Sequence, residues 1–366
     1  MCWSIFILIL YSEDDIMLCA LIMAGGKGTR FWPLSTDEKP KQFLRLISDR
    51  TMIQTTVDRI LPIVPIDRIF VCTSSKYLEL VKEQLPELPD RNIIVEPEGR
   101  NTAPCIALSS IIMKKYCENC KMLVLPSDHL IRDEKAFREK IIDASIFLDE
   151  HKDAIITLGM NPDRPETGYG YIKKDENEIK MLNSKVYGVE RFVEKPNLSK
   201  AIEYLNEGSY LWNGGMFLWN IDSILNKIKL YMPNTYEALE GILRISNNEL
   251  ENYLNEKYKY TDSISIDYGI LEKDSNIYVI PADIGWDDVG SWNAIERYAE
   301  RDEDNNIHKG ETIVRQCKNN IVIADSDKVI IDDLSDIYVI QNEGKIFIGK
   351  REGLKEIKEL KELVDK

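Results

Sequence analysis

Residues 18–43 read LCALIMAGGKGTRFWPLSTDEKPKQF. This stretch begins with an apolar run of strand length, Leu18–Met23, and then becomes polar abruptly. The polar part opens with Ala24-Gly25-Gly26-Lys27-Gly28-Thr29-Arg30. Its closely spaced glycines permit positive φ angles and let backbone N–H groups approach a ligand. Because a strand that leads into such a turn can cradle phosphates, we expect residues 24–29 to bind a phosphorylated ligand.

Positive side chains continue beyond the glycines. Four cations lie on the same loop, namely Lys27, Arg30, Lys39 and Lys41. The whole chain, in contrast, carries a net charge of −15. This local reversal of charge predicts an anionic ligand.

The glycine spacing excludes two common phosphate loops. The Gly-Lys-Ser/Thr triplet of a Walker loop is missing, and the Gly-x-Gly-x-x-Gly pattern fails after Gly28. The glycines alone are equally consistent with a tight turn that binds nothing. Together with Arg30 and the later lysines, the stretch resembles the Gly-x-Gly-Thr-Arg, Pro-Leu and Pro-Lys signature of the sugar-1-phosphate nucleotidylyltransferases. The variants Trp32-Pro33-Leu34-Ser35 and Pro40-Lys41-Gln42-Phe43 are similar to the mannose-1-phosphate guanylyltransferase branch.

The composition is that of an acidic globular protein. The chain has 366 residues, 44% of them apolar, which suffices for two domains or for one large domain with an appendage. Lys and Arg number 47 against 62 Asp and Glu, so we expect no nucleic-acid partner. Seven scattered cysteines, an odd number, fit a reducing cytoplasm. Cys117 and Cys120 form one Cys-x-x-Cys motif without a second pair, which disfavours a metal or redox role.

The first sixteen residues, MCWSIFILILYSEDDI, differ in composition from the rest of the chain. Their apolar run, Ile5–Tyr11, is too short to span a bilayer and lacks the flanks of a signal peptide. We therefore expect no membrane partner and a cytoplasmic location. We also expect Met17 to be the natural start and residues 1–16 to be an upstream extension. An extra strand or a partner contact is the alternative.

Strand-like and helical patterns alternate over the next part of the chain. We expect strands near 18–23, 69–72, 93–95 and 122–125, and helices beginning after Thr51 and near 77–85, 103–116 and 134–150. Such alternation is typical of a parallel sheet covered on both faces. Together with the resemblance, this pattern predicts that residues 17–304 form an α/β catalytic domain, a Rossmann-like, mostly parallel mixed sheet with helices on both faces.

Polar residues after each strand are informative because ligands of such sheets bind beyond the carboxyl ends of the strands. Glu96 follows the third apolar run, and its carboxylate could accept hydrogen bonds from guanine N1–H and N2–H₂. Arg100 and Asn101 could reach a carbonyl or a phosphate. The plainer interpretation is a helix start capped by Asn101 or Thr102. The segment resembles the Arg-Asn-Thr-Ala-Pro motif of the guanylyltransferases. This resemblance implies that the nucleotide is bound by Glu96, Arg100, Asn101 and Thr102.

A second carboxylate follows the next apolar run, in Pro126-Ser127-Asp128-His129. An acid near a phosphate loop suits Mg²⁺, which prefers few protein carboxylates together with phosphate oxygens. A turn cap is the alternative for Asp128. The resemblance to the family's Pro-x-Asp-His element implies that Asp128 is a catalytic magnesium ligand and that Ser127 contacts the nucleotide. We expect His129 to be structural.

From Ile155 onward, strands are separated by loops rich in Pro and Gly. We expect a strand over 155–160, a strand that ends before Glu194-Lys195, and a tight turn within Trp212–Phe217. On their own, Glu194 and Lys195 could form an exposed ion pair of little weight, and Asn213-Gly214 a hairpin turn.

By resemblance, these elements form the sugar-binding half of the family's site. The backbone at Gly168 would contact a sugar hydroxyl, and Glu194 would accept hydrogen bonds from hydroxyls. Lys195 would hold the sugar phosphate as a point charge. Asn213 would bind the sugar.

The motif DIGWDDVGSW at Asp283–Trp292 resembles the family's Trp-x-Asp-x-Gly-Ser-Trp. The match implies that Asp288 is the second magnesium ligand and that Asp287 occupies a variable position. Without the resemblance, we would interpret Asp288 as the cap of a helix over 291–300. Ser265–Tyr268 is also family-like, and we interpret it as packing at a helix start.

Residues 305–366 contain short β-branched runs separated by polar turns. They predict a small β-rich C-terminal domain that ends in a charged helix over 354–364. This tail resembles the β appendage of the family. Longer relatives carry a cupin-type isomerase domain after it, and we expect no isomerase activity here.

The resemblance extends over nearly the whole chain from Met17. It implies that GTP and mannose 1-phosphate give GDP-mannose and pyrophosphate, with Mg²⁺ as cofactor and no covalent intermediate. Arg30, Lys41 and Asp128 would be catalytic. Two alternatives are the same chemistry with another sugar or base, such as glucose 1-phosphate with UTP or dTTP, and a non-catalytic sugar-nucleotide-binding regulator. The intact set of phosphate-site residues counts against the regulator. We keep a homodimer as a hypothesis.

Overall fold

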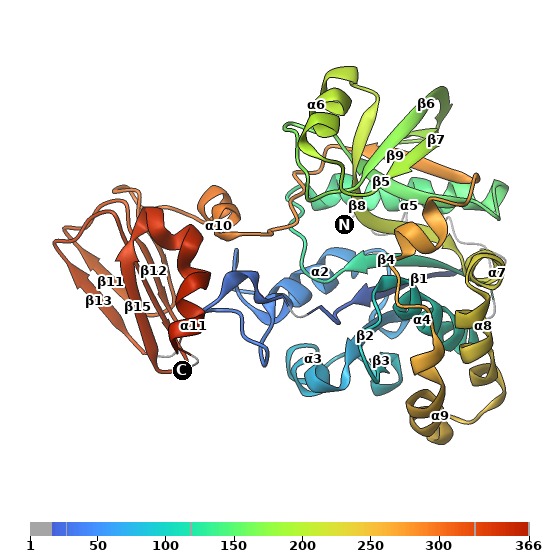
Figure 1. The fold of residues 1–366 in the computed structure, drawn as a ribbon, viewed down its shortest axis with the longest axis horizontal. Coiled ribbons are helices and arrows are strands. Elements are labelled where there is room, and N and C mark those ends of the chain that lie inside the picture. Colours follow the sequence, from blue (N-terminus) through green and yellow to red (C-terminus); the bar gives the residue numbers. More distant parts are fainter. Residues whose placement is uncertain (1–16, 27, 118, 326, 365–366) are drawn as a thin grey trace, which may run out of the picture. The chain divides into compact units, whose positions relative to one another are not determined.

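The computed structural model describes residues 17–26, 28–117, 119–325 and 327–364 (Figure 1). The predictions for residues 1–16 and for Lys27 lie outside these described residues. By packing, the chain divides into two units. Among described residues, unit 1 contains 17–25, 58–126 and 131–286, and unit 2 contains 26–57, 127–130 and 287–364. No helix in the described part of the chain is long and apolar enough to cross a membrane.

Unit 1 is built on a nine-stranded sheet with the order β3-β2-β1-β4-β8-β5-β9-β7-β6 (Figure 1). Its strands are β1 (Met17–Met23), β2 (Ile69–Ser74), β3 (Ile93–Glu96), β4 (Cys120–Pro126), β5 (Ile155–Met160), β6 (Tyr171–Lys180), β7 (Lys185–Val193), β8 (Tyr210–Asn220) and β9 (Ile277–Ala282). Strands β3, β2, β1 and β4 are parallel, and β5 is parallel to β9. Strands β7 and β8 are antiparallel to their neighbours, so the sheet is mixed but mostly runs in one direction.

The helices of unit 1 are α3 (Leu78–Gln84), α4 (Thr102–Tyr116), α5 (Glu134–Glu150), α6 (Leu198–Glu207), α7 (Ile221–Tyr231), α8 (Pro233–Leu239) and α9 (Leu250–Lys257), while α2 (Met52–Ile60) runs from unit 2 into unit 1. Most helices of unit 1 pack on this sheet, whereas α8 and α9 pack on other helices. Cys19 and Leu21 of β1 join the large core cluster together with residues of α4 and α7. Alternate residues of a strand point to opposite faces, so Ala20 and Ile22 lie on the other face of β1. They are fully buried as well. Burial on both faces confirms the predicted α/β class.

The tight turn predicted within Trp212–Phe217 is wrong, because β8 runs without interruption from Tyr210 to Asn220. The two glycines instead mark an irregularity, since the pairing of β8 with β5 shifts between Thr157 and Gly159. A Cβ atom at Gly214 would lie 2.8 Å from Met160 Cε, so glycine here permits close packing inside a strand.

Unit 2 contains the predicted β-rich tail. Its strands are β10 (Ile307–Lys309), β11 (Thr312–Arg315), β12 (Ile321–Ala324), β13 (Val329–Asp332), β14 (Ile337–Asn342) and β15 (Lys345–Lys350). They form a four-stranded sheet, β10-β12-β14-β15, and a two-stranded sheet, β11-β13 (Figure 1). Helix α10 (Trp292–Tyr298) precedes them. The expected closing α-helix is mostly a 3₁₀ helix, Arg351–Leu360, and only α11 (Lys361–Val364) is α-helical.

The core of unit 2 joins the opening loop to the tail. Phe31 and Trp32 pack in one cluster with Trp292, Ile340 and Leu354. The ring centroids of Phe31 and Trp292 lie 5.7 Å apart in an edge-on arrangement. The tail therefore supports the loop that follows the first strand, although the boundary after residue 304 was expected to separate them. Whether residues 17–304 work as one catalytic domain stays a prediction.

Candidate active site

The glycine-rich loop leaves β1 and is held in place by residues 41 and 42. Gly28 adopts φ +46°, and a Cβ atom there would lie 2.6 Å from the backbone nitrogen of Lys41. The side chain of Gln42, which is 2% exposed, donates from Nε2 to the Gly26 carbonyl at 2.8 Å. Sequence reasoning gave Gln42 no role. The structure shows that it braces the loop, and the quoted Pro40–Phe43 motif was the available signal.

Replacing Gly28 with alanine is expected to lower the free energy of unfolding by about 1–3 kcal/mol, because an L residue would be strained at this φ and would meet backbone atoms. Urea denaturation measures the change. Gly26→Ala is the matched control, since a Cβ atom there would have no neighbour within 4 Å. Equal midpoints for both variants would contradict this interpretation of the loop.

Lys41 is a buried cation with two oxygen partners. Its side chain is 5% exposed, and Nζ lies 3.0 Å from Asp128 Oδ2. The same Nζ donates to the backbone carbonyl of Asp288 at 2.5 Å. An ammonium group has three N–H donors, so these two contacts leave one donor for a ligand. The structure thus brings Lys41, Asp128 and Asp288 together within unit 2.

Asp128 remains ionised in this setting. Burial acts to raise the pKa of Asp128, but the charge and hydrogen bond of Lys41, together with His129 and Arg30, outweigh burial and hold the pKa below its usual value. The neighbouring Ser127 is 3% exposed, and its carbonyl accepts a hydrogen bond from Thr56 Oγ1 at 3.2 Å.

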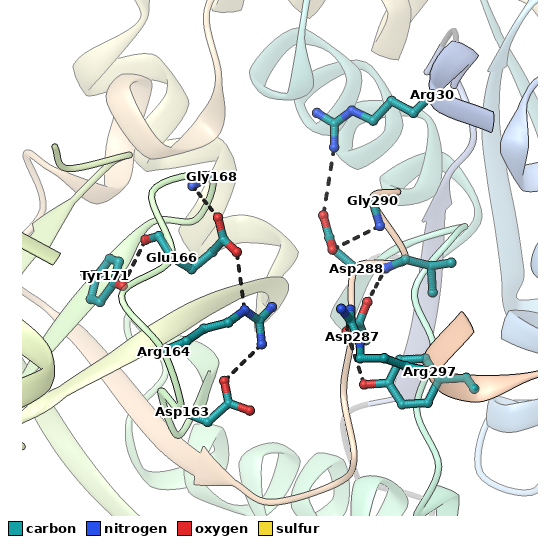
Figure 2. Close-up of polar contacts among 12 residues, drawn as sticks. Arg30, Asp163, Arg164, Glu166, Gly168, Tyr171, Asp287, Asp288, Gly290 and Arg297 are labelled. Atoms are coloured by element: carbon teal, nitrogen blue, oxygen red, sulfur yellow. Dashed lines mark hydrogen bonds and ion pairs between the residues drawn. The ribbon is translucent and has the colours of Figure 1, made fainter. Parts of the chain in front are cut away.

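The two acids of the Asp287-Asp288 pair have different surroundings (Figure 2). Asp287 is 2% exposed and accepts hydrogen bonds from the Val289 amide, the Arg297 guanidinium and the Tyr298 hydroxyl at 2.7, 2.7 and 3.1 Å. Asp288 Oδ1 accepts from the Gly290 amide at 3.1 Å, and its Oδ2 lies 3.9 Å from Arg30 Nη1. Asp287 is therefore a structural acid, and Asp288 is the acid presented to the cations.

The donor set fits a magnesium ion. Lys41 Nζ contacts both the Asp128 carboxylate and the Asp288 backbone carbonyl, and the Asp288 carboxylate lies 3.9 Å from Arg30 Nη1, so both acids offer hard oxygen donors in this part of unit 2. Mg²⁺ is commonly bound through one or two carboxylates with the remaining positions filled by phosphates and water. The groups of three or more metal-ligating side chains found among the described residues lie elsewhere. An ion at the two acids would thus need substrate oxygens to complete its coordination.

A second set of polar residues lies in unit 1, after β3. Glu96 is 4% exposed, and its Oε1 accepts a hydrogen bond from the hydroxyl of Tyr258. Burial raises the pKa of Glu96 to about 7, and hydrogen bonds from Tyr258 and Cys72 oppose the rise. Its Oε2 would lie 3.2 Å from a Cβ atom at Gly25, so the carboxylate borders the start of the glycine-rich loop.

The following residues shape the start of α4. Asn101 is the N-cap, with φ +74°, and its Oδ1 accepts from the Thr102 amide at 2.9 Å. The Thr102 hydroxyl accepts from the Ile266 amide at 2.9 Å. Arg100 donates from Nε to the Thr261 carbonyl and from Nη1 to Glu98. The capping interpretation of Asn101 therefore holds, and roles for these residues in nucleotide binding stay predictions.

A third set, also in unit 1, brings together residues from four segments. Asn213 Nδ2 donates to Asp267 Oδ1 at 2.9 Å, and Glu194 Oε1 lies 2.7 Å from Lys195 Nζ. A Cβ atom at Gly170 would lie 2.5 Å from Glu194 Oε2 and 3.3 Å from Asn213 Cβ. Burial and the charge of Glu194 raise the pKa of Asp267 to about 6. The sequence placed Asp267 at a helix start, but the structure shows that it also belongs to this set.

The loop that contains Gly168 is fixed by its own side chains (Figure 2). The Gly168 amide donates to Glu166 Oε1 at 3.0 Å, and Glu166 Oε2 lies 3.4 Å from Arg164 Nε. The Arg164 guanidinium lies 4.9 Å from the centre of the Trp212 ring. Tyr171 donates to the Glu166 carbonyl at 2.9 Å. The predicted backbone contact of Gly168 with a sugar stays a prediction.

Comparisons with known proteins agree with this arrangement. A family model described as nucleotidyl transferase matches residues 19–305. The chain is 36% identical over 354 residues to the mannose-1-phosphate guanylyltransferase of Escherichia coli K12, covering 95% of this chain and 73% of the relative. It is 36% identical to mannose-1-phosphate guanylyltransferase ManC of Salmonella typhimurium, with the same coverage. A crystal structure from Thermus thermophilus, named mannose-1-phosphate geranyltransferase, superimposes with a TM-score of 0.80 at 31% identity, covering 96% of this chain and 100% of that one.

These similarities extend over nearly the full length of the chain, and they confirm both the predicted resemblance and the predicted fold. The chain therefore belongs to the nucleotidyl transferase family and, within it, to the mannose-1-phosphate guanylyltransferases.

Proposed function

We propose that this protein transfers GMP from GTP to mannose 1-phosphate and releases pyrophosphate. The names of its relatives support this reaction. The observation that carries the proposal is the buried ammonium of Lys41, bound to Asp128 and to the Asp288 carbonyl beside a glycine-rich loop. The remaining N–H donor of this buried cation could bind a phosphoryl oxygen and stabilise the negative charge that develops there during the reaction.

The chemistry is a single displacement. An oxygen of the sugar phosphate attacks the α-phosphorus of GTP while the bond from that phosphorus to the oxygen bridging to the β-phosphate breaks, so pyrophosphate leaves. No protein nucleophile is needed, because holding two anions in line and neutralising their charge supplies the catalysis. Arg30 and the loop amides would hold the β- and γ-phosphates, and Lys41 would donate to an α-phosphoryl oxygen.

Mg²⁺ is the cofactor we propose, held by Asp128 and Asp288. When bound, such an ion neutralises phosphate charge and orients the transferring group. The protein's part is to keep both carboxylates ionised, and the low pKa of Asp128 ensures this for one of them.

The two sets of polar residues in unit 1, one around Glu96 and one around Asn213, would select the two substrates. Glu194 and Asn213 would bind sugar hydroxyls, and Lys195 would bind the sugar phosphate. Asp267 would orient the Asn213 amide through their 2.9 Å hydrogen bond. On the other substrate, Glu96 would accept hydrogen bonds from guanine, with Tyr258 fixing one carboxylate oxygen so that the other faces the base.

Replacing Glu96 with glutamine is expected to reduce the preference for GTP over ATP by about 10- to 100-fold when measured above the Glu96 pKa of about 7, because a hydrogen bond to a charged acceptor contributes roughly 1.5–3 kcal/mol. The ratio of kcat/KM values for the two nucleotides measures the change. Glu79→Gln is the control, since the Glu79 side chain is 86% exposed and its ion-pair partner Lys82 has no proposed role in the site. An unchanged ratio in the Glu96 variant would assign base recognition to other groups.

The proposed reaction is tested by a substrate panel. Pyrophosphate release is measured with GTP, ATP, UTP and dTTP, each combined with mannose 1-phosphate or glucose 1-phosphate, with magnesium added or withheld. We expect the highest kcat/KM for GTP with mannose 1-phosphate, and only with magnesium. A clear preference for glucose 1-phosphate with UTP or dTTP would replace the proposal by the same chemistry on other substrates. No release from any combination would favour a regulatory protein.

A further inference from the structure

Four sulfur atoms meet in unit 1 at the amino-terminal ends of β1 and β4. The ligand atoms of Cys19, Cys117 and Cys120 all lie within 4.8 Å of one another. The thioether sulfur of Met17 lies 3.9 Å from Cys117 Sγ. Cys19 and Cys120 are each 2% exposed, whereas Cys117 is partly exposed and gives access to the cluster.

The fold explains why these residues converge. Strands β1 and β4 are parallel, and Met17 pairs directly with Cys120. Because residues two apart on a strand share a face, Cys19 lies on the same face as Met17 and Cys120. Cys117 is the residue at which α4 ends, and its amide donates to the Met113 carbonyl. One helix end and two strands therefore fix the relative positions of the four sulfurs.

From this geometry we infer that Cys19, Cys117 and Cys120, with Met17 beside them, form a binding site for a thiophilic metal ion such as Zn²⁺ or Cu⁺. With metal–sulfur bonds of about 2.3 Å, sulfur ligands in a tetrahedral site lie roughly 3.8 Å apart. The observed cluster needs only a small contraction to reach that spacing. Thiolate and thioether ligands select soft ions over Mg²⁺ and Ca²⁺.

Metal binding to thiols displaces their protons, so the affinity of this site for its ion should fall as the pH is lowered.

This site differs from the proposed phosphate site. Cys19 lies near the start of β1, whereas the glycine-rich loop follows its end. An ion there would tie α4 to β1 and β4 and would stabilise unit 1 without contacting a substrate. The Cys-x-x-Cys motif alone gave no reason to expect it, because the third and fourth sulfurs come from a strand about a hundred residues earlier in the chain.

The test uses the full-length protein, reduced and treated with a chelator. Titration with Co²⁺, a spectroscopic stand-in for Zn²⁺, should produce a thiolate-to-metal charge-transfer band that saturates at one ion per chain. A parallel titration with Cu⁺ against a competing chelator distinguishes the two ions. Binding should also raise the unfolding temperature.

Cys117→Ser is the decisive variant because Cys117 is the partly exposed member of the cluster, and circular dichroism checks that the variant folds as the parent does. Loss of a residue that only supports a metal ligand lowers metal affinity by roughly 10- to 100-fold. Because Cys117 would itself be a ligand, we expect the affinity of the Cys117→Ser variant for Co²⁺ to fall by more than this. Cys317→Ser, in the tail, is the control and should bind as the parent does. Absence of both the Co²⁺ band and Cu⁺ binding, equal affinity in the Cys117 variant, or a disulfide among these cysteines in freshly isolated protein would overturn the inference.

Discussion

Lys41→Ala should reduce kcat by about 10³-fold or more while the protein remains folded. Removing a single preorganised donor from a developing charge costs about 10²–10³ in rate, and Lys41 also carries a full positive charge in a buried position. The variant leaves Asp128 without its closest cation, so its free energy of unfolding should fall as well. Initial rates with GTP and mannose 1-phosphate, together with urea denaturation, measure both effects.

Two further variants separate catalysis from stability. Lys41→Met keeps most of the side-chain volume and should be as inactive as Lys41→Ala. Arg45→Ala removes an exposed cation four residues away and should leave the rate unchanged. A Lys41 variant with near-normal kcat would remove Lys41 from the mechanism.

Asp288→Asn should reduce the magnesium-dependent rate by about 10²–10⁴-fold, because metal-assisted charge stabilisation contributes several kcal/mol. Its stability should hardly change. The new amide oxygen can still accept from Gly290, and the long contact with the exposed Arg30 contributes little. The magnesium dependence of pyrophosphate release measures the effect.

The neighbouring acid provides the matched control. Asp287→Asn alters a buried carboxylate that three groups donate to, so we expect the free energy of unfolding to fall by about 1–3 kcal/mol. Its magnesium requirement should persist in the folded fraction. If Asp287→Asn lost magnesium dependence and Asp288→Asn retained it, the assignment of the two acids would be reversed.

Local sequence patterns predicted the parts of the fold that depend on neighbours in the chain. The apolar period placed α5 and β5 at their observed bounds, and the alternation of elements predicted the sheet class. The motif match predicted that Lys41, Asp128 and Asp288 would be close together, although they are far apart in sequence. Their observed contacts agree with that expectation.

Features that depend on long-range packing were beyond local patterns. Glycines at 214 and 215 indicated a turn, but pairing with β5 keeps them inside a strand. The period of residues 354–364 indicated an α-helix, whereas most of this segment is 3₁₀. The contact of Asp267 with Asn213 joins residues 54 apart, and no short pattern contains both.

The stereochemistry at the α-phosphorus tests the central claim most directly. GTP labelled with sulfur at one α-phosphoryl position is converted with mannose 1-phosphate, and the configuration of the product is determined. A single displacement at a phosphorus held by Lys41 predicts inversion of configuration. Net retention would require two displacements through a covalent enzyme intermediate and would contradict the account.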